Sequence, residues 1–173
     1  AGTVGYPTPN FVSATVGSST LAYHNAVNTA VISTGLPAGQ HWDHVIMQDQ
    51  SEMCTQFGSV ALHRSSYVSL LGKVRLHSPN AVGIGYQTWS RAPDFHYFTA
   101  PNPAYPGGPA EMTSQIKNGY DLSTADAIAA YGEGASKVAR VGEAWQAANW
   151  DRLHIADMSH AQNRGSLLAA MVI

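Results

Sequence analysis

The sequence has 173 residues, enough for one domain with a sizeable core and too few for two ordinary domains. Hydrophobic residues make up 45% of the chain and charged residues only 12%, and the formal net charge is -2 with no run of lysine or arginine. This balance argues against nucleic acids and acidic membrane surfaces as partners, and no apolar stretch reaches the roughly 20 residues that span a bilayer.

The first half of the chain alternates between strand-like and helix-like segments. β-branched residues predict a strand over residues 10–16, and apolar residues at helical spacing predict a helix over 19–33. The short apolar run at 44–48 is typical of a buried parallel strand. An amphipathic helix is expected over 58–74, and a second buried strand over 81–89.

The second half continues this alternation after an irregular stretch. Residues 100–109 hold four of the nine prolines, which predicts a long loop, and such loops in compact domains are often functional. A helix is expected over 124–135, a strand over 137–142 and a closing helix over 163–173. We therefore expect a single α/β domain over residues 1–173 with a mainly parallel sheet, whose ligands bind at the carboxyl ends of the strands.

The first polar motif, "VGSST" (16–20), lies between a predicted strand and a predicted helix. Backbone N–H groups at such a junction can hold an oxyanion, and Gly17 would allow close approach of a substrate. Ser18 or Ser19 is either a nucleophile or a simple helix N-cap. The residues alone leave both roles open.

The second polar motif, "MQDQS" (47–51), follows the next predicted strand. Gln48 and Gln50 offer side-chain N–H donors, which are suitable for an oxyanion, and Asp49 offers a carboxylate. A hydrogen-bonded turn explains the same residues equally well. The motif therefore indicates an oxyanion donor only in combination with other motifs.

The third motif, "DMSH" (157–160), places a carboxylate three residues before an imidazole. A neutral imidazole can accept and return the proton of a serine hydroxyl, and a carboxylate on its other ring nitrogen fixes the tautomer. Asp157 and His160 are then the orienter and the base of a triad. In the alternative interpretation, Asp157 or Ser159 caps a helix that begins near Ala161.

The remaining histidines show no metal-ligand spacing, and the pair in "HWDH" (41–44) precedes a strand, where its side chains would diverge. Cys54 is the only cysteine, which excludes an internal disulfide and a thiolate cluster. We expect no metal and no cofactor. The few charges and the small residue Ala1 suit a mature exported chain, so we expect a secreted or extracytoplasmic protein.

Together these motifs resemble the SGNH (GDSL-like) hydrolase superfamily of esterases and deacetylases. The resemblance runs from Val16 to the end of the chain and is carried by five segments in order: "VGSSTLAYH", "WDHVIMQDQS", "YQTWSR", "RVGEAW" and "DMSHAQNRGSLLAAMVI". The second segment resembles the "WDxVxLQxQS" pattern of one branch of the superfamily. The resemblance implies a three-layer α/β/α sandwich of the flavodoxin-like SGNH type.

The same resemblance implies a role for each motif. His160 is the base and Asp157 its orienter, Gly17 supplies a backbone oxyanion donor, and Gln50 stands where the family has an amide donor. The implied reaction is ester hydrolysis, in which a serine attacks the carbonyl carbon and the tetrahedral oxyanion is held by Gly17 and Gln50. The implied substrate is a small ester or an acetylated carbohydrate.

One βα unit of the family pattern is missing, because only one strand fits before Gly17. In one interpretation "VGSST" is the oxyanion block, and a second chain or an N-terminal peptide completes the sheet and brings the nucleophile. The family strand order 2-1-3-4-5 would then leave a costly gap in an isolated sheet. In the other interpretation Ser19 itself is the nucleophile. The family pattern favours the first, and the physics of an isolated chain favours the second.

An alternative to an enzyme is a catalytically incomplete SGNH-like module or processed fragment. The aromatic segment 94–108 could stack on sugar rings or simply pack over the sheet edge. Such a module would bind carbohydrate or a partner chain. A structural or assembly role is a third interpretation.

Overall fold

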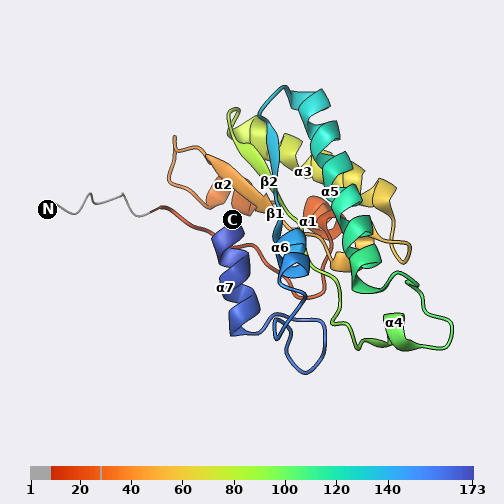
Figure 1. Ribbon diagram of the computed structural model, residues 1–173. Coiled ribbons are helices and arrows are strands. Elements are labelled where there is room, and N and C mark those ends of the chain that lie inside the picture. The colour runs from red at the N-terminus through yellow and green to blue at the C-terminus, as the bar shows by residue number, and fades with distance from the viewer. Residues whose placement is uncertain (1–8, 28) are drawn as a thin grey trace, which may run out of the picture.

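The computed structural model describes residues 9–27 and 29–173, and a parallel sheet lies at its centre (Figure 1). In this part of the chain the sheet has three strands, β1 (His44–Met47), β2 (Val82–Tyr86) and β3 (Ser136–Ala139), in the order β1-β2-β3. Both pairs are parallel. Each crossover contains a long helix, which is the connection that parallel strands require.

One face of the sheet is covered by α1 (Leu21–Val27), α3 (Val60–His77) and α5 (Gly108–Tyr131). The packing there depends on two glycines in β2. A Cβ added to Gly83 would lie 3.0 Å from the Leu71 side chain, and one added to Gly85 would lie 3.0 Å from the Tyr120 ring. The glycines therefore let α3 and α5 approach the central strand. The buried cluster on this face contains Leu21, Met47, Tyr67, Leu70, Leu71 and Ala127.

The other face carries α6 (Val141–Ala147) and α7 (Asn163–Val172), which contact each other. Their buried cluster contains Val141, Trp145, Leu153 and Ala169, with Tyr86 of β2 packed against it. Helices on both faces of a parallel sheet make a three-layer α/β/α sandwich, as the family resemblance of the sequence implies. None of the helices described is long and apolar enough to cross a membrane.

The shorter elements lie in the connections. α2 (Val31–Thr34) precedes β1, a 3-10 helix η1 (Ser51–Cys54) follows β1, and α4 (His96–Thr99) lies in the loop after β2. The helix expected over 19–33 is thus divided into α1 and α2. The hydroxyl groups of Ser33 and Thr34 both donate to the Ala30 carbonyl, and such local bonds compete with a continuous helix.

The helix whose length differs most from the sequence prediction is α5. This helix begins at Gly108, whereas a helix was expected only from residue 124. Pro109, which the composition assigns to a loop, occupies the first turn, where a missing N–H costs nothing. The Glu111 carboxylate accepts the N–H of Gly107 and closes the same turn.

The strand expected over 10–16 does not form. Residues 10–16 have no regular secondary structure, and the Phe11 side chain is 79% exposed. β-propensity expresses packing against neighbours, and no described strand pairs with this segment. Likewise, β1 has no described partner on the side opposite β2, and Ile46 in β1 is 47% exposed.

We expect Gly165→Ala to destabilise the fold by about 1–3 kcal/mol, the usual cost of overpacking. A Cβ there would lie 2.4 Å from the Leu153 carbonyl oxygen and 2.6 Å from the Trp145 ring, so α7 would have to move away. Urea unfolding measures the change. Ser166→Ala, at an exposed position of the same helix, should shift the midpoint little. Equal midpoints for Gly165→Ala and the wild type would contradict this packing.

Candidate active site

Asp157 and His160 form a hydrogen-bonded pair in the loop before α7. The Nδ1–H of His160 donates to Asp157 Oδ2 at 2.6 Å, and Asp157 Oδ1 accepts the backbone N–H groups of His160 and Ser159. The bonds from His160 and Ser159 lower the pKa of Asp157 to about 2, so the group is a carboxylate at neutral pH. The pair is exposed, with 78% of the His160 side chain accessible to solvent. It is therefore accessible to a substrate from solution.

The helix-cap interpretation of "DMSH" does not describe this loop. α7 begins at Asn163 with Gln162 at its N-cap position, so neither Asp157 nor Ser159 caps it. Instead, the loop is fastened to the segment after β2. The Trp89 indole N–H donates to the Ser159 carbonyl at 2.9 Å. The pairing of a carboxylate with an imidazole is thus a property of the loop itself.

Gln50 lies at the carboxyl end of β1, and its neighbour Asp49 holds the turn. The buried Asp49 carboxylate accepts the backbone N–H groups of Gln50 and Leu21 and the Nδ1–H of His63 at 2.8 Å. It therefore joins the loop after β1 to the start of α1 and to α3. The sequence gives no local sign of the pair between Asp49 and His63, because the two residues meet only when α3 packs beside β1.

The Gln50 amide is oriented by Glu52. Its Nε2 donates to Glu52 Oε2 at 3.2 Å, which leaves a second N–H for another acceptor. Glu52 Oε1 accepts from Arg91 at 2.8 Å and from the Tyr97 hydroxyl at 3.0 Å. Burial raises the pKa of Glu52, but the bonds from Arg91, Tyr97 and Gln50 outweigh it and lower the pKa below its ordinary value. Sequence reasoning singled out Gln50 but missed Glu52 and its other two partners.

Gly17 and Ser19 lie in an exposed turn before α1. A Cβ added to Gly17 would meet nothing within 4 Å, so its backbone is open to a ligand. The Ser19 hydroxyl donates to the Val16 carbonyl at 2.8 Å and lies 2.8 Å from Nε2 of His24. In the described part of the chain, no hydrogen bond joins Ser19 to His160. The structure thus joins Asp157 with His160 directly and leaves Ser19 in a separate cluster.

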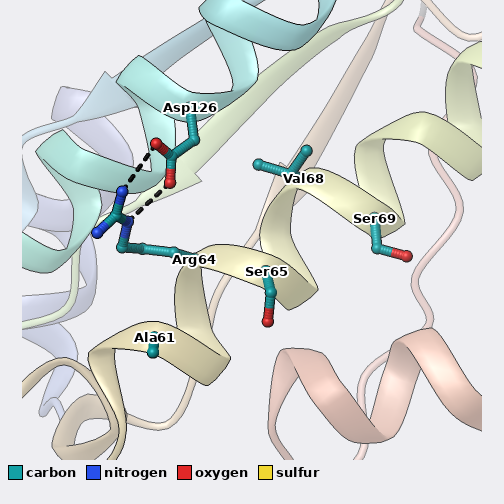
Figure 2. Close-up of a pocket in the computed structure, with 6 residues that line it drawn as sticks. All are labelled: Ala61, Arg64, Ser65, Val68, Ser69 and Asp126. Carbon is teal, nitrogen blue, oxygen red and sulfur yellow. Dashed lines mark hydrogen bonds and ion pairs between the residues drawn. The ribbon is translucent and has the colours of Figure 1, made fainter.

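A hollow on the surface of α3 lies outside these motifs (Figure 2). It is lined by Ala61, Arg64, Ser65, Val68, Ser69 and Asp126. Its main polar feature is a pair of hydrogen bonds from the Arg64 guanidinium to the Asp126 carboxylate, at 2.7 and 2.9 Å (Figure 2). None of the candidate site residues lines it. Among the described residues, no group of three or more His, Cys, Asp or Glu side chains could hold a metal ion.

No protein-family model and no curated protein matches the sequence. Two solved structures are similar to this chain. One is a protein from Slackia heliotrinireducens provisionally assigned as an SGNH hydrolase, with a TM-score of 0.66, 24% identity and coverage of 90% of this chain and 78% of that one. The other is a DUF4886 family protein from Bacteroides uniformis, with a TM-score of 0.60, 20% identity and coverage of 78% of this chain and 50% of that one.

These similarities concern the fold alone, since both sequence identities are below 25%. They agree with the parallel sheet between two helical layers. The chain therefore has an α/β three-layer sandwich with an SGNH-like fold.

Proposed function

We propose that this protein is a serine ester hydrolase in which His160 is the general base. The hydrogen bond between Asp157 and His160 is the observation that carries the proposal. The Asp157 carboxylate fixes the proton on Nδ1, so the unprotonated Nε2 can take the proton of a serine hydroxyl as it attacks an ester carbonyl. His160 then returns this proton to the alcohol that leaves. In the second half of the reaction, His160 takes a proton from water as the water attacks the acyl-enzyme, and it returns that proton to the serine oxygen.

The oxyanion of the tetrahedral intermediate would be held by Gly17 and Gln50. The N–H of Gly17 lies in an open turn, and the second N–H of the Gln50 amide remains after its bond to Glu52. Amide donors of both kinds stabilise the charge that develops in acyl transfer. The proposed substrate is a small ester or an acetylated carbohydrate, with no cofactor in the reaction.

The nucleophile has two candidate sources. Ser19 supports the first, because its hydroxyl already lies 2.8 Å from an imidazole nitrogen of His24. In this version the turn at residues 16–19 must bring Ser19 to His160 when substrate binds. Catalytic hydrogen bonds often reach their working geometry only in the complex with substrate.

The second source is a segment outside the described residues, on an N-terminal peptide or a second chain. The open edge of β1, the exposed Ile46 and the irregular segment 10–16 support it. A strand added beside β1 would satisfy the backbone groups of that edge. A serine at its carboxyl end would reach the same side of the sheet as Gln50.

A fluorophosphonate probe tests the function and separates the two sources. The protein is incubated with the probe and, separately, with p-nitrophenyl acetate, and the labelled peptide is identified by mass spectrometry. Label on Ser19 supports the first source, and label on a co-purifying peptide supports the second. A protein that neither reacts with the probe nor turns over the ester would refute the hydrolase proposal.

We expect Ser19→Ala to abolish both labelling and turnover if Ser19 is the nucleophile, because alanine has no hydroxyl to acylate. Thr20→Ala is the matched control, since it removes a neighbouring hydroxyl whose bond is to the backbone N–H of Tyr23. Full activity of Ser19→Ala beside an inactive His160→Ala would instead assign the nucleophile to another segment.

The aromatic segment 94–108 favours the non-catalytic alternative only weakly. Tyr105 is fully buried, with its ring 6.0 Å from that of Tyr97 and 5.9 Å from that of Phe98. The segment thus uses Tyr105 for packing, and Phe95, Tyr97 and Phe98 are only partly exposed. Glycan binding without hydrolysis would support a carbohydrate-binding module.

A further inference from the structure

Arg91 bridges the two loops that carry the candidate catalytic groups. It follows β2, and its side chain is only 15% exposed. One terminal nitrogen donates to Glu52 Oε1 at 2.8 Å, in the loop after β1. The other donates to the Ser159 hydroxyl, in the loop of Asp157 and His160. Three segments that are distant in the sequence are thus joined by one guanidinium group.

At one end of this bridge, Glu52 determines where the Gln50 amide points. Its two oxygens accept from three donors, Gln50 in the loop after β1 and Arg91 and Tyr97 in the connection after β2. A carboxylate with this many partners has one preferred orientation. Loss of Arg91 would remove the charged partner and leave Glu52 free to rotate away from Gln50.

At the other end, Ser159 lies between Asp157 and His160. Its hydroxyl accepts from Arg91, its carbonyl accepts from Trp89, and its N–H donates to Asp157. The segment after β2 also holds this loop by a backbone bond, from the Ala92 N–H to the Met158 carbonyl at 2.9 Å. Ser159 is therefore one of the points at which the body of the protein holds the pair of Asp157 and His160.

We propose that Arg91 is a positioning residue, which fixes the Gln50 amide and the Asp157–His160 pair relative to each other through Glu52 and Ser159. The catalytic consequence rests on the proposed hydrolase function, but the positioning itself does not. A guanidinium group suits this role because its planar fork donates in two directions at once, whereas a lysine ammonium acts as a single flexible point charge.

Hydrogen exchange tests the positioning without any substrate. In Arg91→Met, we expect the amides of Ser159 and His160 to exchange at least about tenfold faster, because the loop that holds their bonds to Asp157 loses its charged side-chain anchor. Arg64→Met is the matched control. It removes a guanidinium that likewise makes two hydrogen bonds, both of them to the Asp126 carboxylate beside the hollow of Figure 2, and should leave these amides unchanged.

Two further variants keep the test decisive if Arg91→Met fails to fold. Arg91→Lys retains the charge, and we expect intermediate exchange rates at residues 159–160. Arg91→Ala should regain slow exchange at these amides when free guanidinium is added at a concentration that does not unfold the protein. Wild-type exchange rates in all Arg91 variants, or an equal change in Arg64→Met, would overturn the positioning role.

Steady-state kinetics with p-nitrophenyl acetate measure the catalytic consequence. We expect Arg91→Met to lower kcat by about 10–100-fold with KM changed less than twofold, because misplacement of about 1 Å affects the transition state more than binding. A wild-type protein without turnover would refute the hydrolase function, and the exchange result would still decide the role of Arg91. Fast exchange with an unchanged kcat would overturn the catalytic part.

Discussion

Replacing His160 with alanine is expected to lower ester turnover by about 10²–10⁴-fold, the usual contribution of a general base. Asp157→Asn should cause a loss of the same order, because an amide at this position can stabilise the wrong imidazole tautomer. Both effects should appear in kcat rather than in KM. The measurement is hydrolysis of p-nitrophenyl acetate together with the rate of fluorophosphonate labelling.

The pH dependence gives this experiment a second readout. The pKa of Asp157 is depressed to about 2, so its carboxylate is fully ionised above about pH 4. The effect of Asp157→Asn should therefore be present at every pH between about 4 and 9 and should fade only in stronger acid. His44→Ala, which removes an exposed histidine at the amino end of β1, is the control. Equal losses in His44→Ala and His160→Ala would argue against a specific base.

Replacing Asp49 with alanine is expected to destabilise the fold by about 3–5 kcal/mol, the range for breaking a buried polar pair from one side. The substitution leaves the His63 Nδ1–H and the backbone N–H of Leu21 without their acceptor in a buried site. Each such unsatisfied donor costs about 1–3 kcal/mol. Urea unfolding of the purified variant measures the loss.

Two controls separate this effect from a general cost of removing a carboxylate. Asp49→Asn keeps one acceptor oxygen and the shape of the side chain, so its loss should be smaller than that of Asp49→Ala. Asp126→Ala removes a half-exposed carboxylate that pairs with Arg64, and such a surface pair is worth only about 0–1 kcal/mol. Similar unfolding midpoints for Asp49→Ala and Asp126→Ala would show that the buried pair adds no stability.

The alternation of strands and helices was predictable where a segment carries its own pattern. The apolar runs at 44–48 and 81–89 contain β1 and β2, and the helix expected over 58–74 corresponds to α3. β2 ends earlier than expected, at Tyr86. There the backbone turns, because the Gln87 N–H bonds to the carbonyls of both Gly85 and Ala139.

The errors occur where a segment depends on a neighbour. The composition of residues 10–16 is that of a strand, but a strand also needs a partner for its backbone groups, and none is described beside it. The first half of α5 was missed because Pro109 and its neighbouring glycines indicate a loop, although a proline is well suited to the first turn of a helix.

In the candidate site, too, some features follow from the local sequence and others do not. The pairing of Asp157 with His160 follows from a spacing of three residues in one loop, and the sequence alone contains this information. The role of Ser19, the secreted location, the single-domain boundary over 1–173 and the substrate class stay predictions. The similarity to one solved structure, provisionally assigned as an SGNH hydrolase, supports an SGNH-like fold without naming a substrate.

By itself the sequence determined the α/β class, the closeness of Asp157 to His160 and the position of Gln50 at the end of a strand, because each is a local pattern of side chains. Only the tertiary structure decided which distant groups meet. His63 reaches Asp49 through the packing of α3, and Arg91 joins Glu52 to Ser159 through the assembly of three loops. These contacts depend on the relative placement of whole elements, which no local spacing encodes.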